Sequence, residues 1–323
     1  MRFPLYHRPD SLVFLDDDAG YLETLALVMP RDWGVRLFTH ADDCLQHLDA
    51  QHTLWEADVW QHQQILTQWR GGRFLIPQIL NYWNTANYRY GLTQTCVVDY
   101  AMPAMTGLEF LEKLPAWPAN RVLLTGRADE LIAVGAFNNG LIGQYVPKQH
   151  GNIGKHLIEV LRTQHSKPMQ LHDAVWRGAL KPEQYAMLQS RDVQSHLRGF
   201  LQEKHWLEYV VVPAPFGILA LDKYAKAYWL QLELKTDLHS AADLAESTEH
   251  GSLVVNSVRN GTHFVNDELL MSLGSDEAPT TLPTFALDSS GNLLGAVFVV
   301  PSSLTYGVSY RDYFASLPPR TIA

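Results

Sequence analysis

In the first half of the chain, short apolar runs alternate with longer segments in which apolar residues recur at helical spacing. The runs have the length of buried parallel strands, and they are Leu12–Leu15, Val35–Phe38, Thr95–Val98, Arg121–Leu124 and Gln144–Pro147. A segment with helical spacing follows each run, at residues 21–28, 41–48, 108–114, 131–137 and 153–162. Five alternations of strand and helix predict a parallel α/β sheet with helices on both faces.

Charged and hydroxyl side chains follow these strands at the ends where ligands bind in such sheets. Asp16 and Asp17 follow the first strand, Asp99 the third, Thr125 the fourth and Lys148 the fifth. Crowded carboxylates repel one another, raise a pKa or hold a cation, and magnesium prefers oxygen ligands. A lysine and a hydroxyl on the same rim suit a phosphoryl group. These residues predict a magnesium-assisted phosphoryl site in which a carboxylate is the acceptor.

In this order, the residues resemble the receiver domain of two-component response regulators. The resemblance is carried by the acidic pair Asp16-Asp17, the segment DYAMPAMTGLEFL at residues 99–111, Thr125, and Tyr145 three residues before Lys148. The spacings between these motifs also fit the family. The resemblance covers about residues 10–165 and implies a flavodoxin-like (βα)5 fold for a first domain, 1–165.

The resemblance implies a role for each matching position. Asp99 would accept a phosphoryl group from a sensor histidine kinase or a phosphotransfer protein. Lys148 and Thr125 would contact the phosphoryl group, and Tyr145 would move with Thr125 as part of a switch. Receivers commonly dimerise when phosphorylated, so a homodimer is also implied. The Mg2+ ligands would be Asp16, Asp17, Asp99 and the backbone carbonyl of Ala101.

The chain departs from the family pattern in two places. Gln149 follows Lys148 where the family usually has proline, which leaves the loop geometry at Lys148 open. Residues 51–93 form an aromatic-rich insertion where the family has a short connection. Two helices, Ala57–Trp69 and Phe74–Tyr88, are predicted there, joined at Gly71-Gly72. Their aromatic side chains are expected to pack within the protein; the alternative is an oligomer or partner surface.

The second half, residues 166–323, has a mixed pattern that predicts an α+β domain with an antiparallel sheet. The predicted helices are 169–180, 183–188, 193–203 and 238–249. The predicted strands are 207–221, which Pro213 and Pro215 break, and 227–234, 253–258, 284–287 and 292–300. The Leu221-Asp-Lys-Tyr-Ala-Lys226 turn is predicted to join the first two strands as a hairpin, and Asp288-Ser-Ser-Gly-Asn292 is a strong hairpin signal between the last two.

Output chemistry is not apparent in this second half. Neither a glycine-rich phosphate loop nor a helix-turn-helix with a basic recognition helix can be found. His172-Asp173 matches the HD dipeptide of metal phosphohydrolases, a pattern that needs further His and Asp ligands on neighbouring helices. Asp192 and His196 follow at no recognisable spacing, so a solvated helix face is the favoured interpretation.

Length, composition and charge indicate which class of protein this is. A length of 323 residues suggests two domains, and 46% hydrophobic residues indicate a globular chain. The net charge of −9 is shared by both halves, which disfavours nucleic acid as a partner. Two cysteines offer no disulfide framework, and the N-terminus has no signal-peptide pattern or membrane span, so a cytoplasmic location is expected.

Together these features predict a response regulator that signals through a non-DNA-binding second domain, by contact with a protein or a small ligand. One alternative is a receiver-controlled enzyme whose chemistry lies in the second domain. The other is direct transcriptional regulation.

Overall fold

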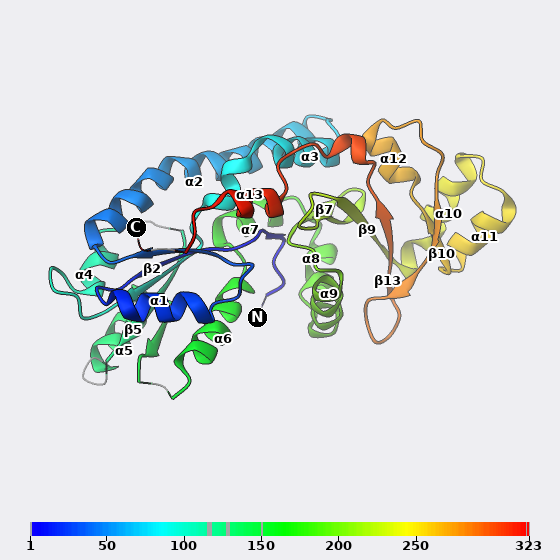
Figure 1. Ribbon diagram of the computed structural model, residues 1–323. Helices are drawn as coiled ribbons and strands as arrows, with labels where there is room; N and C mark the ends of the chain where they lie inside the picture. Colours follow the sequence, from blue (N-terminus) through cyan, green and yellow to red (C-terminus); the bar gives the residue numbers. More distant parts are fainter. Residues whose placement is uncertain (1, 115–117, 127–129, 150, 321, 323) are drawn as a thin grey trace. The chain divides into compact units, whose positions relative to one another are not determined.

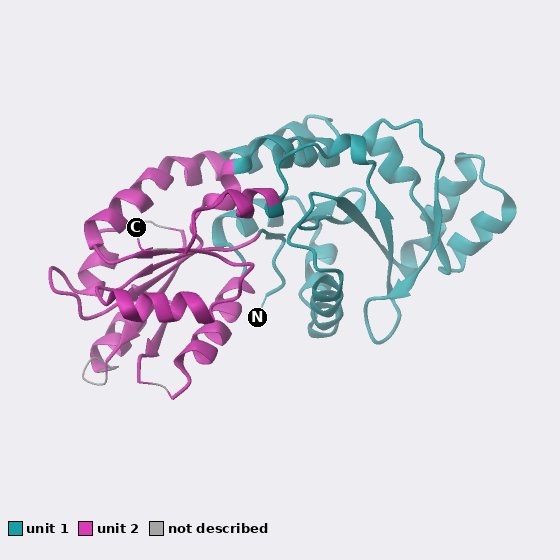
Figure 2. Cartoon of the chain, viewed as in Figure 1, with its two compact units in different colours: residues 1–8, 60–87, 168–311 teal, residues 9–59, 88–167, 312–323 magenta. Residues whose placement is uncertain are grey.

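The computed structural model of the chain describes residues 2–114, 118–126, 130–149, 151–320 and 322 (Figure 1). The chain forms two compact units (Figure 2). Unit 1 consists of residues 1–8, 60–87 and 168–311, and unit 2 of residues 9–59, 88–167 and 312–323. The domain ranges 1–165 and 166–323 stay predictions. No helix in the described part of the chain is both long and apolar enough to cross a membrane.

Unit 2 is built on a five-stranded parallel sheet in the order β3-β2-β4-β5-β6. Its strands are β2 (Ser11–Leu15), β3 (Gly34–Phe38), β4 (Thr95–Asp99), β5 (Asn120–Thr125) and β6 (Gln144–Pro147). Strand β2 pairs with β3 on one side and with β4 on the other, so the strand order reverses beside β2. Ligand crevices of open α/β sheets lie at such a reversal. The predicted flavodoxin-like sheet is confirmed.

Helices cover both faces of this sheet. They are α1 (Ala19–Val28), α2 (Ala41–Arg70), α4 (Gly107–Glu112), α5 (Glu130–Asn138) and α6 (Ile153–His165). Helices α1 and α6 lie side by side (Figure 1) and share one core with Val122 and Leu124 of β5. Helix α4 lies on the opposite face, because Gly107 at its start is beside Leu123, whose side chain points the other way.

Helix α2 corrects one prediction about the insertion. The sequence predicted a helix ending near Leu48 and a separate helix from Ala57, but α2 runs without a break from Ala41 to Arg70. No glycine or proline interrupts these 30 residues, so nothing ends the helix early. It ends at the Gly71-Gly72 turn, where Gly72 has φ +96°. Helix α3 (Leu75–Thr85) follows, and then a 3-10 turn, η1 (Asn87–Gly91).

The insertion's aromatic residues divide between burial and exposure. Trp55, Tyr82, Trp83 and Tyr90 are buried, as the favoured interpretation expects. Trp60 and Phe74 remain more than half exposed.

Unit 1 is built on a six-stranded antiparallel sheet in the order β1-β7-β8-β9-β13-β12. Its strands are β1 (Tyr6–His7), β7 (Glu208–Pro213), β8 (Phe216–Leu221), β9 (Ala227–Leu234), β12 (Phe285–Ala286) and β13 (Leu293–Val299). Both predicted hairpins are present: β8 pairs with β9, and β12 pairs with β13. The N-terminal residues were not predicted to join this sheet, yet Tyr6 pairs with Val210 at its edge.

The remaining elements of unit 1 are α3, six further helices and a small sheet. The helices are α7 (Gln170–Arg177), α8 (Pro182–Leu188), α9 (Arg191–Lys204), α10 (Leu238–Ser247), α11 (Ser252–Arg259) and α12 (Asp267–Leu273). Short 3-10 turns, η3 (Lys235–Asp237) and η4 (Ser302–Leu304), and the strand pair β10 (His263–Val265) and β11 (Thr281–Pro283) complete the unit.

Helix α11 overturns the predicted strand at 253–258. The run of valines there is typical of a strand, but it is ambiguous over so few residues. Val255 and Val258, three residues apart, share one helix face and pack with Ala242 and Ala245 of α10. Burial of that face against α10 is what makes the segment helical.

The C-terminal segment belongs to unit 2. Helix α13 (Tyr310–Ser316) leads into it, and Ile322 forms a parallel bridge with Leu37 on the edge strand β3. The Arg320 guanidinium donates to four backbone carbonyls at and beyond the end of α1. Its partners are the oxygens of Ala26 at 3.1 Å, Met29 at 3.0 Å, Trp33 at 2.8 Å, and Pro30. The sequence pattern did not predict that the C-terminal segment packs against β3 and the end of α1.

Candidate functional site at the carboxyl edge of the parallel sheet

Four of the predicted site residues lie together at the carboxyl edge of the parallel sheet. Asp99 ends β4 and pairs with Leu124, the residue before Thr125. Thr125 ends β5 and pairs with Pro147, the residue before Lys148. Asp16 follows β2, the strand beside β4. Parallel pairing in register therefore brings these side chains to adjacent strand ends.

Lys148 lies between the two buried carboxylates. Its Nζ is 2.6 Å from Oδ2 of Asp16 and 2.9 Å from Oδ1 of Asp99. The Asp16 side chain is 1% exposed and the Asp99 side chain 5%, so both carboxylates are buried, while the Lys148 side chain is 24% exposed. Buried carboxylates need such partners, because an unpaired charge is costly in a poorly solvated place.

Burial and charge act in opposite directions on the pKa values at this site. Burial raises the pKa of Asp16, while the hydrogen bond and charge of Lys148 and the amide of Asp18 act to lower it. Burial alone would lower the pKa of Lys148, but its bonds to Asp16 and Asp99 outweigh that effect and raise the pKa. The lysine is therefore firmly charged between the two carboxylates.

The acidic residues are suitable ligands for a hard cation. Asp16, Asp17 and Asp99 each offer a carboxylate oxygen, and these oxygens lie within 4.8 Å of one another. Asp17 is exposed, so the group is open to solvent on that side. Ala101 lies two residues beyond Asp99 in the exposed loop before α4, where its carbonyl was predicted to add a ligand. An all-oxygen donor set with solvent access fits Mg2+, which keeps several waters.

Thr125 supplies an independent sign that a ligand belongs at this edge. Its side chain is fully buried, and its Oγ1 has no hydrogen-bond partner among the described residues. A buried hydroxyl without a partner is uncommon in folded proteins. The hydroxyl is therefore available to an oxygen-rich group bound beside Asp99.

The Thr106-Gly107 pair shapes the loop after Asp99. Thr106 caps α4 through a capping box with Glu109, with bonds of 2.7 and 3.2 Å. A Cβ at Gly107 would lie 2.2 Å from the Asp99 carbonyl oxygen, so only glycine allows this close approach. The threonine and glycine of the predicted motif thus hold the backbone around Asp99.

The remaining predicted residues occupy β6 and its end. Tyr145 is half-buried on β6 and pairs in register with Leu123. The described residues contain one cis peptide bond, Ala214–Pro215, so the Lys148–Gln149 bond is trans. Lys148 therefore reaches both carboxylates although Gln149, and not proline, follows it.

Tyr21 is a site residue that the sequence did not single out. Nζ of Lys148 lies 4.7 Å from the centre of its ring, within cation–π range. Burial, reinforced by the charges of Asp16 and Asp99, raises the pKa of Tyr21 to about 12 against the effect of Lys148. Its position on α1 fitted a core pattern, so no sequence signal separated it from the other apolar residues of that helix.

The HD dipeptide does not lie on a solvated helix face, which corrects that interpretation. His172 is fully buried and Asp173 is 7% exposed. Oδ1 of Asp173 accepts a hydrogen bond of 2.9 Å from the amide of Leu5. Asp192 and His196 pair with each other on α9, with Oδ1 of Asp192 3.3 Å from Nδ1 of His196.

The parallel sheet, its strand order and the carboxylate–lysine cluster at its edge define a flavodoxin-like receiver fold, with a separate antiparallel sheet in unit 1. The chain is similar over almost its whole length to the Legionella pneumophila response regulator LqsR. That match has a TM-score of 0.75 and 21% identity, and it covers 99% of this chain and 98% of LqsR. The fold is therefore that of a known response regulator, including the second unit.

Two further solved structures match about half of the chain. The CheY-like receiver from Methanospirillum hungatei JF-1 is 17% identical with a TM-score of 0.32, covering 49% of this chain and 94% of its own. TrrA from Thermotoga maritima, in complex with Mg2+-BeF, is 13% identical with a TM-score of 0.30, covering 48% and 98%. No family model matches the sequence, and no curated protein matches it.

Proposed function

We propose that this chain is a response regulator that accepts a phosphoryl group on Asp99 in a Mg2+-dependent reaction. The donor would be a sensor histidine kinase or a phosphotransfer protein. The observation that carries the proposal is the convergence of Asp99, Lys148 and the unpaired hydroxyl of Thr125 at adjacent strand ends. That combination offers a nucleophile, a cation and a hydroxyl donor for one tetrahedral anion.

Each residue has a role that follows from its position. Asp99 is the acceptor, because its carboxylate ends β4 beside the other groups. Lys148 leaves its ion pair with Asp99 for the phosphoryl oxygens as charge builds up there. Thr125 donates its hydroxyl to the same group. When bound by Asp16, Asp17, Asp99 and the Ala101 carbonyl, Mg2+ would neutralise phosphoryl charge.

The output of the switch would begin at Thr125 and Tyr145. Movement of Thr125 toward a phosphoryl group would let Tyr145 turn inward from its half-buried position on β6. The neighbouring helix α5 presents exposed apolar side chains, with Leu131 87% and Phe137 49% exposed. An apolar patch of this kind supports a homodimer or partner surface on unit 2.

Labelling of the full chain with acetyl phosphate tests the acceptor assignment. Wild type should incorporate one acid-stable but base-labile phosphoryl group in the presence of Mg2+ and none after chelation. Asp99→Asn should abolish labelling, while Asp49→Asn, at an exposed position on α2, should leave it unchanged. Undiminished labelling of Asp99→Asn in a folded protein would refute the assignment.

Unit 1 would transmit the signal through contact with a protein or a small ligand rather than with DNA. A receiver-controlled enzyme is the second candidate. It is favoured by a buried group of two histidines and a carboxylate that lies apart from the phosphoryl site. Turnover by unit 1 would show as an activity that changes when beryllofluoride and Mg2+ occupy the receiver site.

A further inference from the structure

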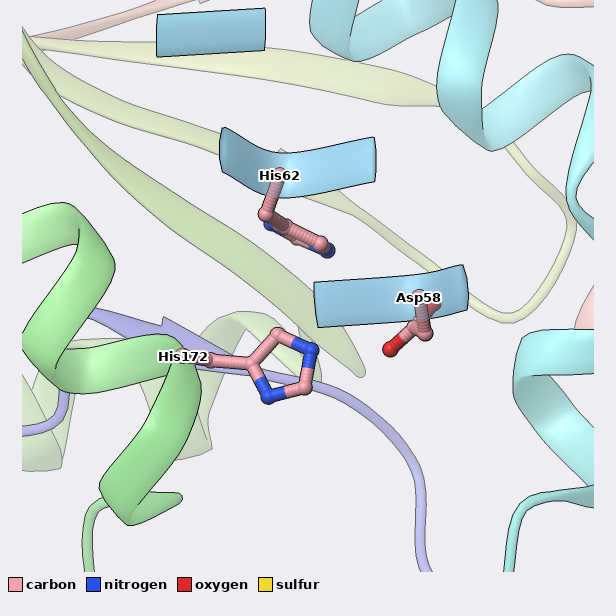
Figure 3. A group of neighbouring side chains, drawn as sticks. All are labelled: Asp58, His62 and His172. Atoms are coloured by element: carbon pink, nitrogen blue, oxygen red, sulfur yellow. The ribbon is translucent and has the colours of Figure 1, made fainter. Parts of the chain in front are cut away.

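Helices α2 and α7 carry a buried group of possible metal ligands, which is separate from the proposed phosphoryl site. Asp58 and His62 lie four residues apart on one face of α2, and His172 lies on α7. Their exposed fractions are 0%, 1% and 0%. One ligand atom from each residue lies within 4.8 Å of the others, and Figure 3 shows the side chains pointing toward one another.

We propose that Asp58, His62 and His172 bind a divalent transition-metal ion of the zinc class. Two imidazoles and one carboxylate make a mixed nitrogen and oxygen donor set, which suits Zn2+ and its neighbours. Mg2+ and Ca2+ prefer oxygen donors alone. The two kinds of site in this chain therefore differ in ion preference: oxygen ligands in the receiver, histidine nitrogens here.

The arrangement of the two histidine rings suits a shared ion. Their centroids are 4.7 Å apart and their planes are at 89°. Two imidazoles bound to one tetrahedral ion, with metal–nitrogen bonds of about 2.1 Å, have ring centres roughly 5 Å apart. The observed ring separation already matches this value, so the rings need only small movements to share an ion.

Aromatic side chains of unit 1 enclose the two histidines. The ring of Tyr6 lies 4.6 Å from His62 and 5.0 Å from His172, and the ring of Tyr82 lies 4.7 Å from His62, between centroids. This shell limits ring rotation and excludes water. Three protein donors leave one position of a tetrahedral ion for a water or a small ligand.

Trp176 gives metal binding a specific signature. Its Nε1 donates to Nδ1 of His62 at 2.9 Å. An indole N–H can only donate, so the neutral His62 ring carries its proton on Nε2 in the metal-free protein. Metal binding through Nε2 moves that proton to Nδ1 and breaks the bond with Trp176.

The first test titrates metal-free full-length protein with Zn2+ in excess Mg2+, which occupies the receiver site. Calorimetry should show one equivalent bound, and elemental analysis after gel filtration should retain it. Co2+ in place of Zn2+ should give the visible absorption of a tetrahedral nitrogen and oxygen site. Wild type that retains no zinc and gives only the spectrum of hydrated Co2+ would overturn the proposal, whether or not any variant folds.

Variants assign the ion to these residues. His62→Gln and His172→Gln should each lower Zn2+ affinity at least 100-fold. His239→Gln, at an exposed position on α10, is the matched control and should bind as wild type does. Asp99→Asn should also keep the zinc, which separates this proposal from the phosphoryl site. Equal zinc retention by wild type and by folded His172→Gln would show that the ion binds elsewhere and would refute the assignment.

Tryptophan fluorescence tests the ligand atom. Zn2+ should change the emission of wild type as Trp176 loses its partner on His62, and the change should disappear in Trp176→Phe. An emission change that persists unaltered in Trp176→Phe would contradict coordination through Nε2 of His62.

Discussion

Replacement of Arg320 by alanine should destabilise unit 2 although the residue lies only three positions from the C-terminus. The guanidinium donates to carbonyls of Ala26, Met29, Pro30 and Trp33, which lie at and just beyond the end of α1. Helix α1 has no basic residue of its own in the last turn. Arg320 therefore supplies the positive charge that helix ends favour, from nearly 300 residues away in the sequence.

The magnitude follows from these bonds. A hydrogen bond that involves a charged group contributes about 1.5–3 kcal/mol, and a cation at a helix C-terminus adds about 0.3–1 kcal/mol. The four bonds share one partly buried guanidinium, so their contributions do not add in full. We expect Arg320→Ala to lower the free energy of unfolding of unit 2 by about 2–4 kcal/mol. Arg320→Lys keeps the charge but not the planar fork of donors, and should recover less than half of the loss.

Because a two-unit chain need not unfold in one step, the assay must resolve unit 2. Hydrogen–deuterium exchange read by mass spectrometry does so, with peptides from α1 and β3 reporting on the tail and peptides from β8 and β9 as an internal reference. Arg320→Ala should speed exchange in α1 and β3 and leave β8 and β9 unchanged. Arg31→Ala, at an exposed position near the same helix end, is the control and should change the free energy by less than about 0.5 kcal/mol. Arg320→Ala that behaves as Arg31→Ala would refute the reasoning.

Three further predictions concern single residues. Gly107→Ala should destabilise unit 2 by about 3 kcal/mol, because the new Cβ would collide with the Asp99 carbonyl. Gly135→Ala on α5, where nothing lies within 4 Å, should instead stabilise that helix by about 0.5–1 kcal/mol. Hydrogen–deuterium exchange of unit 2 peptides measures both changes. Lys148→Met should tighten Mg2+ binding on the order of tenfold, measured by fluorescence titration, because the competing cation is gone; weaker binding would contradict the ion-pair geometry. Burial, with the charges of Glu268 and Asp237, raises the pKa of Glu233 to about 8 from 4.5. The folded state then holds a proton that the unfolded chain has released, so stability should fall as pH rises from about 4.5 to about 8, and Glu233→Gln should flatten that part of the curve in thermal unfolding.

The receiver half was predictable because its signals are local. Four of the five strands end at or next to a site residue, so Asp16, Asp99, Thr125 and Lys148 could be placed from the strand pattern and the loop motif. Parallel pairing then brings consecutive strand ends to the same edge, and this follows from the fold class without knowledge of side-chain contacts. Tyr21 was missed because its apolar ring fits the core pattern of α1 as well as it fits a site.

Other features depended on partners that local pattern cannot identify. The valines of α11 lie in a helix because they pack against α10, where they are buried. The same residues packed against the edge of a sheet would favour a strand. The separate helix predicted from Ala57 does not exist, because no residue between Ala41 and Arg70 breaks helix α2.

The order of strands and helices in the receiver half, and the chemistry at its strand ends, could be predicted from the sequence because both depend on residues close together in the chain. Tertiary structure alone decided which distant residues meet: Arg320 with the end of α1, Tyr6 with β7, and His172 with His62. Such contacts have no period and no fixed spacing. They form when buried polar groups pair during packing. The sequence shows which polar groups are present, but not which of them will pair.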